Sequence, residues 1–142
     1  PFQKFAIKPS FASKMLTSST LNIPPFYALH ELLNFWRELG VETVYREIKR
    51  RTEHARAVFE KEIGWETVSP ASEHCGPLVS FVVPAKWSRQ GYSLLHTIRE
   101  HTGVQVACPV FQNKLLLRLS PHIWNDLEDI EIGISKMREF FR

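Results

Sequence analysis

The stretch LLLRLSPHIWNDLEDI, residues 115–130, combines an apolar strand pattern with the start of a helix, and a positive charge lies within the strand part. Side chains alternate between the two faces of a strand, so its first, third and fifth residues, all leucine, are predicted to face a core while Arg118 faces away from it. Asp126 has a side chain that often caps a helix start, and acidic residues follow it in the first turn. The stretch therefore predicts a strand, a short loop and a helix.

Two interpretations of Arg118 are open. In the first, it is a surface or edge arginine whose stem packs on neighbouring side chains, which spacing alone favours because a buried unpaired charge is costly. In the second, it is an anchor for a carboxylate, since a planar fork of donors on a rigid strand suits bidentate binding. The loop SPHIWN that follows the strand is then expected to complete a pocket.

Further helix and strand patterns lie upstream of this stretch. Apolar residues at helical spacing predict one helix from the Pro-Pro pair 24–25 to Gly40 and a second from there to Gly64. A β-branched run at 78–83 predicts a strand, and Gly103 is predicted to end another helix. These elements alternate in type, which indicates a mixed fold.

The last elements complete the expected fold. Residues 104–108 and 115–120 are predicted to be strands, joined by a connection that contains FQNK, residues 111–114. The expected order is helix, helix, strand, helix, strand, strand, helix. This order predicts an α+β fold with a small, mostly antiparallel sheet of about three strands covered by helices. Residues 1–22 are expected to be an irregular lead-in, and residues 23–142 a single domain.

The composition indicates a globular domain and argues against several kinds of partner. The chain has 142 residues, 44% of them apolar, and a net charge of +3, which fits one domain with a core. The basic run Lys49–Arg51 lies between Glu47 and Glu53 and is interpreted as a hydrated helix face, so no nucleic-acid partner is expected. No stretch is apolar enough to cross a bilayer, so no membrane partner is expected, and the cytoplasm or an organellar matrix is the expected location. Pro1 in place of methionine suggests a segment upstream.

Neither the cysteines nor the histidines form a convincing catalytic or metal-binding pattern. Cys75 and Cys108 fit a reducing compartment, and each is interpreted as a small buried hydrophobe rather than a nucleophile. The six histidines fall at no spacing typical of a zinc site. The residues therefore predict no metal site and no catalytic group of their own.

The segment RLSPHIWNDLEDIE, residues 118–131, resembles the C-terminal signature of class V pyridoxal-phosphate-dependent enzymes of fold type I, which include cysteine desulfurases, kynureninases and isopenicillin N epimerase-like proteins. In that family an arginine is followed by serine, a histidine or similar residue, a tyrosine-asparagine pair and an acidic helix start. The matching residues are Arg118, Ser120, His122, Asn125, Glu128 and Asp129. Trp124 stands where tyrosine is usual and lacks its hydroxyl.

A second segment, TSSTLNIPPFYALHELLNFWRELGVETVYREI, residues 17–48, is similar to the part of these enzymes that carries Gly-Thr-Arg-Asn before two helices. Thr20 and Asn22 stand at the expected positions, with serine and leucine in place of the glycine and the arginine. Residues 103–120 look most like the epimerase-like branch, so the resemblance covers most of the chain.

The resemblance implies roles for four residues. Arg118 and Asn125 are expected to bind the substrate, with Arg118 at the α-carboxylate of an amino acid. Thr20 and Asn22 are expected to bind the cofactor, pyridoxal 5′-phosphate, and Thr20 would reach the cofactor phosphate of the neighbouring subunit in a homodimer. An alternative interpretation of Thr20 is a polar residue in a loop before a helix.

The resemblance also identifies what the chain lacks. In the family, the lysine that forms the Schiff base and the acidic partner of the pyridine nitrogen lie in a large domain upstream, and no lysine here has the family's glycine-rich context. Pyridoxal phosphate is therefore expected to be bound mainly by a large domain or chain that partners this one.

Two functions remain open at this point. In the first, the chain is the C-terminal domain of a pyridoxal-phosphate-dependent aminotransferase, epimerase or lyase. In the second, it is a non-catalytic domain derived from an aminotransferase, which serves as a binding or structural subunit of a larger assembly. The reaction type is left open, because these activities share the same carboxylate anchor.

Overall fold

The structure is a computed structural model that describes residues 11, 23–69 and 76–142. Thr20, Asn22 and Cys75, to which the sequence analysis assigns roles, lie outside these residues. The chain divides into two compact units, Pro1–Leu39 and Gly40–Arg142.

The described part of the first unit is mainly the helix α2, Pro24–Leu39. It begins at the Pro-Pro pair and ends before Gly40, as predicted, because proline suits the first turn of a helix and glycine its end. Gly40 has a positive φ of 77°, a conformation that glycine adopts without strain.

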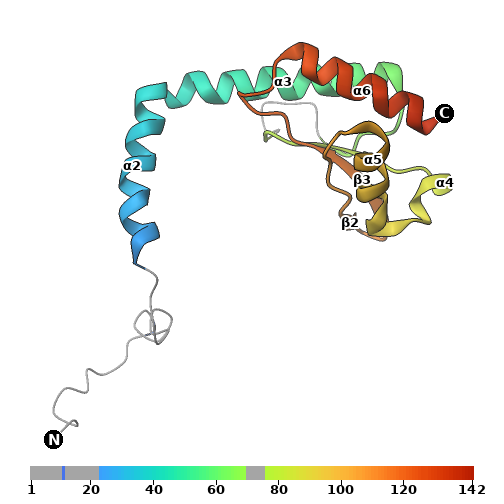
Figure 1. The fold of residues 1–142 in the computed structure, drawn as a ribbon, viewed down its shortest axis with the longest axis horizontal. Helices are drawn as coiled ribbons and strands as arrows, with labels where there is room; N and C mark the ends of the chain where they lie inside the picture. The colour runs from blue at the N-terminus through green and yellow to red at the C-terminus, as the bar shows by residue number, and fades with distance from the viewer. Residues whose placement is uncertain (1–10, 12–22, 70–75) are drawn as a thin grey trace, which may run out of the picture. The chain divides into compact units, whose positions relative to one another are not determined.

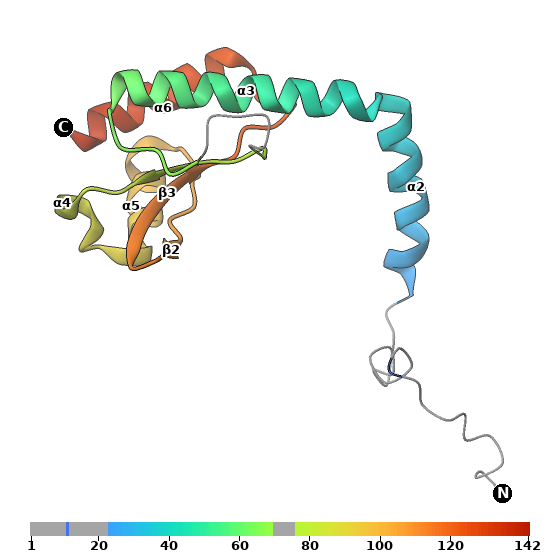
Figure 2. The same ribbon diagram turned by 180° about the vertical axis from the view of Figure 1, so that it is seen from behind.

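The second unit is an α+β domain, which confirms the predicted fold class. Its main helices are α3 (Val41–Glu62), α5 (Leu94–Thr102) and α6 (Leu127–Phe141), and two short helical segments, α4 (Ala85–Ser88) and η2 (Gly91–Ser93), precede α5. Helices α3 and α6 pack side by side, as both views show (Figures 1 and 2). α5 packs against α6 and ends at Gly103, whose left-handed φ of 73° matches the predicted stop.

The sheet has three antiparallel strands in the order β1-β3-β2. The strands are β1 (Val79–Val82), β2 (Val110–Phe111) and β3 (Lys114–Leu119), so β3 lies in the centre. Isolated bridges extend it, one from Thr67 to β1 and one from Ala107 to β3. The sequence analysis placed the first and last strands correctly.

The predicted strand at residues 104–108 is wrong. Only Ala107 in this segment pairs with β3, and the regular pairing begins after Pro109, at Val110. Proline has no N–H to donate to a strand partner, so it interrupts the ladder between the two pairings. The FQNK connection is confirmed as a tight hairpin turn, since Gln112 and Asn113 both have positive φ, 47° and 60°.

The core lies on one face of the sheet and is closed by the three main helices. The first, third and fifth positions of LLLRL, Leu115, Leu117 and Leu119, face this core as predicted. Phe59 of α3 stacks on Phe81 of β1 with ring centroids 4.0 Å apart. The remaining core side chains come from α3, β1, α5, α6 and the segment before β2: Ala55, Val79, Val83, Leu94, Ile98, Val106, Cys108, Ile130, Ile134 and Met137.

The start of α6 confirms the predicted cap. The Asp126 carboxylate accepts a hydrogen bond from the Asp129 N–H at 2.7 Å, and the Asp129 carboxylate accepts one from the Asp126 N–H at 3.2 Å. This reciprocal capping box satisfies backbone donors that a helix start leaves unpaired. It also fixes where the loop after β3 turns into α6.

Among the helices in the described ranges, none is both long enough and apolar enough to cross a membrane.

Candidate functional site

Arg118 lies in the central strand, on the face of the sheet opposite to the core. Its N–H donates to the Ala107 carbonyl at 2.8 Å, and its carbonyl accepts from the Ala107 N–H at 3.3 Å. On the neighbouring strand β1, the residue directly opposite Arg118 is Ser80. Because both chain neighbours of Arg118 are buried in the core, its own side chain is directed to the other face, where it is half-buried.

The side chain of Arg118 makes no hydrogen bond or ion pair with any residue that the structure describes. Other arginines of the domain are engaged: Arg51 and Arg50 bind Glu47, and Arg138 binds Glu62 at 2.6 Å. A guanidinium has five N–H donors. When the arginine is half-buried, an acceptor that binds these donors stabilises it. Arg118 is thus available for a ligand, as the carboxylate-anchor interpretation requires.

We call this side of the sheet the outer face. The residues that lie on it are Ser80, Val82, Ala107, Leu116 and Arg118. The two strand neighbours directly beside Arg118, Ser80 and Ala107, are both small and half-buried. The small side chains at these two positions add little bulk beside the guanidinium. Leu116, on the same face, is buried and makes this part of the face apolar.

No described acidic side chain neutralises the outer face. Glu66, whose carbonyl accepts from the Val82 N–H at the sheet edge, is exposed and forms no salt bridge with Arg118. An uncompensated positive charge favours an anion as ligand.

Asn125 has a structural function in the loop after β3. Its side-chain oxygen accepts from the His122 N–H at 3.0 Å, and its N–H donates to the His122 carbonyl at 3.0 Å. Its own carbonyl accepts from Nε of Arg51 at 2.6 Å, which ties the loop to α3. The substrate-binding function of Asn125 stays a prediction, and only its side-chain NH₂ remains for it.

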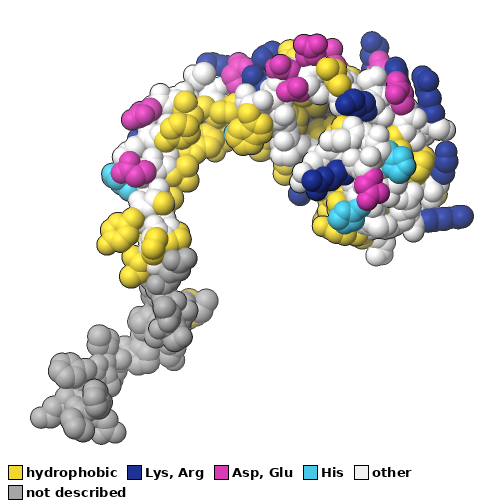
Figure 3. All heavy atoms as spheres, viewed as in Figure 1, with side chains coloured by type: hydrophobic (Ala, Val, Ile, Leu, Met, Phe, Trp, Pro, Cys, Tyr) yellow, Lys and Arg dark blue, Asp and Glu magenta, His cyan; other side chains and the backbone are white. Residues whose placement is uncertain are grey.

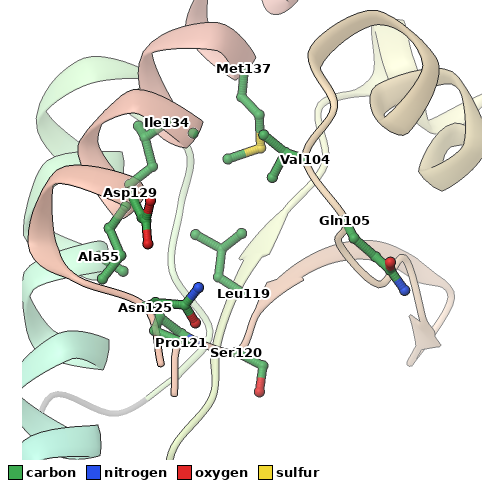
Figure 4. A pocket seen from close by; sticks show the side chains of 12 residues that line it. Ala55, Val104, Gln105, Leu119, Ser120, Pro121, Asn125, Asp129, Ile134 and Met137 are labelled. Carbon is green, nitrogen blue, oxygen red and sulfur yellow. The ribbon is translucent and has the colours of Figure 1, made fainter. Parts of the chain in front are cut away.

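The loop also borders a cavity of about 140 Å³ between α3, α6 and the end of β3 (Figure 4). Ser120, Pro121 and Asn125 of the loop line it, together with Ala55, Val104, Gln105, Leu119, Asp129, Ile130, Gly133, Ile134 and Met137. Arg118 is not among the lining residues. The loop therefore forms a hollow as expected, but not one that contains the guanidinium, and an acid bound by Arg118 would have to be enclosed from outside this domain.

Cys108 lies in the core, which agrees with its interpretation as a small hydrophobe. It is fully buried and unpaired, and burial raises the pKa of its thiol to about 11. A thiol with a raised pKa holds little of the nucleophilic thiolate form at neutral pH. Burial and the raised pKa both agree with a packing function for Cys108.

The basic run Lys49–Arg51 is largely engaged within its own helix. Lys49 pairs with Glu53 at 3.9 Å and Arg50 with Glu47 at 3.1 Å, and acidic and basic side chains alternate over α3 and α6 (Figure 3). Arg51 is 15% exposed in its side chain and holds the loop at Asn125. Within the described ranges, no three His, Cys, Asp or Glu side chains gather in a metal-binding group.

Sequence reasoning missed the contribution of Ser80 and Ala107. Both stand in segments distant from Arg118 in sequence, and only the strand register brings them beside it. The one sequence feature that could have indicated them is a small residue between two apolar ones in a strand. This feature is common in strands and does not by itself indicate a ligand site.

The chain is similar in structure to BacF from Bacillus subtilis, which was solved with a substrate bound. The TM-score is 0.55 and the sequence identity 24%, over 70% of this chain and 24% of BacF, so the chain spans about a quarter of the length of BacF. No protein-family model matches the chain, and no curated protein matches it. At this identity the similarity shows a shared fold for the matched part and leaves the activity to be argued from the site.

Proposed function

We propose that this chain is the C-terminal domain of a pyridoxal-phosphate-dependent enzyme of the class V, fold type I group, and that Arg118 binds the α-carboxylate of its amino-acid substrate. The observation that carries the proposal is Arg118 itself, a half-buried residue of the central strand that lies between two small neighbours and whose side chain has no partner among the described residues. The resemblance of residues 118–131 to the family signature supports the same function. The fold shared with part of BacF is compatible with it.

In this proposal, the domain binds and orients the substrate, and the cofactor is held elsewhere. Thr20 and Asn22 lie outside the described residues, and of the described lysines only Lys114 shares a strand with Arg118. The two are four positions apart along β3, about 13 Å at the usual rise of a strand. Pyridoxal phosphate supplies the electron sink for chemistry at Cα, and a large domain or chain would hold it against the outer face.

A fixed carboxylate contributes to catalysis through orientation. Two parallel hydrogen bonds from the guanidinium fix both oxygens of the acid, so the bond to be broken at Cα is held at a defined angle to the cofactor ring. The arginine stands on a strand with neighbours on both sides, which would hold its backbone in place while the substrate is bound.

The experiment is the replacement Arg118→Lys in the chain assembled with its large domain, with Arg99→Lys on the exposed side of α5 as the matched control. Lysine keeps the charge and removes the fork. A charge-assisted hydrogen bond contributes about 1.5–3 kcal/mol, so we expect the KM for the amino acid to rise about 10- to 100-fold. The visible absorbance of bound pyridoxal phosphate should stay unchanged, and the control should behave as wild type. An unchanged KM in Arg118→Lys would contradict the proposal.

The second candidate is the non-catalytic domain. Trp124, in place of the family's tyrosine, is 75% exposed and stacks on His122 with centroids 3.7 Å apart, which gives the loop an aromatic surface without the tyrosine hydroxyl. Such a surface suits protein binding. Absence of pyridoxal phosphate absorbance from the assembled protein would favour this function over the first.

A further inference from the structure

The register of the sheet places Ser80 beside Arg118 on the outer face. The N–H and carbonyl of Arg118 both bond to Ala107, on the other side of β3. Ser80 in turn uses its N–H and carbonyl on the side away from β3, where it donates to Oγ of Ser69 at 2.9 Å and accepts from the Val68 N–H at 3.0 Å. Ser80 and Arg118 are thus a non-hydrogen-bonded antiparallel pair, the kind whose Cα atoms lie only about 4.5 Å apart and whose side chains lie closest.

The hydroxyl of Ser80 is available in this position. Thr67 and Ser69, at the same edge, use their hydroxyls on the backbone: Oγ1 of Thr67 donates to the Ser80 carbonyl at 3.3 Å, and Oγ of Ser69 accepts from the Ser80 N–H. The Ser80 hydroxyl itself makes no hydrogen bond with any described residue. Its backbone N–H and carbonyl are both hydrogen-bonded to the segment 67–69, so the hydroxyl is presented from a fixed point.

A carboxylate can use both groups at once. Its two oxygens offer about four lone-pair directions, of which a bidentate guanidinium takes two. A hydroxyl that stands beside the guanidinium can donate to one of the others. On the other side of Arg118, Ala107 has no side chain that can donate a hydrogen bond. A second donor to the carboxylate is therefore expected only from Ser80 on β1.

We propose that Ser80 is a second substrate-binding residue, whose hydroxyl donates to the carboxylate bound by Arg118. This rests on the proposed carboxylate-binding function of Arg118. The ligand is an amino acid that is bound through its α-carboxylate. A larger residue at position 80 would reduce the space available to this carboxylate.

The test compares Ser80→Thr with Ser80→Val in the ¹⁵N-labelled chain assembled with its large domain, titrated with L-alanine and, as control, with L-alaninamide, which lacks the carboxylate. Threonine and valine have nearly the same shape and both suit strands, but only threonine keeps the hydroxyl. The shifts of the backbone amides of residues 80, 107 and 118 report binding. We expect wild type and Ser80→Thr to bind L-alanine within twofold of each other, Ser80→Val to bind about 5- to 10-fold more weakly, and L-alaninamide to cause no saturable shift.

The other outcomes separate the two proposals. If Ser80→Val binds as wild type does while Arg118→Gln loses binding, the function of Ser80 is refuted and that of Arg118 stands. If Ser80→Thr and Ser80→Val are weakened equally, the effect is steric and the hydroxyl has no part in it. If the assembled wild-type protein shows no saturable carboxylate-dependent shift, the acid site at Arg118 is refuted, and the function of Ser80 with it.

Discussion

Replacing Arg118 by leucine should leave the stability of the domain nearly unchanged. The guanidinium makes no hydrogen bond or ion pair with the described residues, so the replacement removes no partner and leaves no group unsatisfied. Leucine retains the apolar stem, and its neighbour on the same face, Leu116, is buried. The free energy of unfolding should therefore change by no more than about 0.5 kcal/mol.

Arg138→Leu is the contrasting variant. Arg138 of α6 binds Glu62 at the end of α3 at 2.6 Å, and the side chains of the pair are 33% and 27% exposed. Its loss leaves a partly buried carboxylate without a partner, which costs about 1–2 kcal/mol once solvent screening is allowed for. Each kcal/mol corresponds to a few degrees, roughly 3–5 °C, in the melting temperature of a domain of this size.

The assay is urea unfolding of both variants and wild type, followed by far-ultraviolet circular dichroism. The m-values should agree, so differences in midpoint report stability. We expect Arg118→Leu to unfold with wild type and Arg138→Leu to unfold earlier. A loss of more than about 1.5 kcal/mol in Arg118→Leu would refute the reasoning, because losses of this size follow from broken buried interactions and Arg118 would then be part of the fold rather than of a binding site.

Three further predictions concern the helix cap, the buried thiol and an acidic group on α3. Asp126→Ala should lower the free energy of unfolding by about 1 kcal/mol, measured by thermal unfolding, because the capping box at α6 is lost; an unchanged melting temperature would contradict this. Cys108, whose pKa is raised to about 11 by burial, should resist a thiol reagent at pH 8 in the native chain and react in urea; rapid native reaction would show that the thiol is accessible. The pKa of Glu47 lies below its ordinary value because of hydrogen bonds from Arg51 and then Arg50, so its stabilising effect is present above the unfolded pKa and is lost as the pH falls through the lowered folded pKa. Arg51→Met should move the Glu47 titration, followed by carboxyl NMR, upward toward the ordinary value, and a titration that stays in place would exclude Arg51 as the main cause.

Local chemistry made much of the fold predictable. The cap at Asp126 and the helix end at Gly103 depend on a few consecutive residues, and the structure shows both. The face of Arg118 was also predictable, because alternation along a strand needs only the knowledge of which neighbours are buried. The hairpin at Gln112 and Asn113 followed from its polar composition.

Long-range pairing was beyond the reach of the sequence. The partner of Arg118 on β1 is set by a register that depends on the lengths and paths of the intervening segments, so Ser80 could not be identified in advance. The same holds for the bond from Arg51 to the Asn125 carbonyl, which joins α3 to the loop before α6, 74 residues further along the chain. The segment 104–108 differs from the predicted strand for a local reason: Pro109 has no N–H to donate, and the apolar run before it pairs with β3 only at Ala107.

The most direct test of the proposed carboxylate anchor is a crystal structure of the chain assembled with its large domain, with pyridoxal phosphate and an amino-acid substrate bound. We expect the two terminal nitrogens of Arg118 to lie about 2.7–2.9 Å from the two oxygens of the substrate carboxylate, the spacing of a charge-assisted bidentate pair. A substrate whose carboxylate is held by other residues, with Arg118 directed into solvent, would contradict the account.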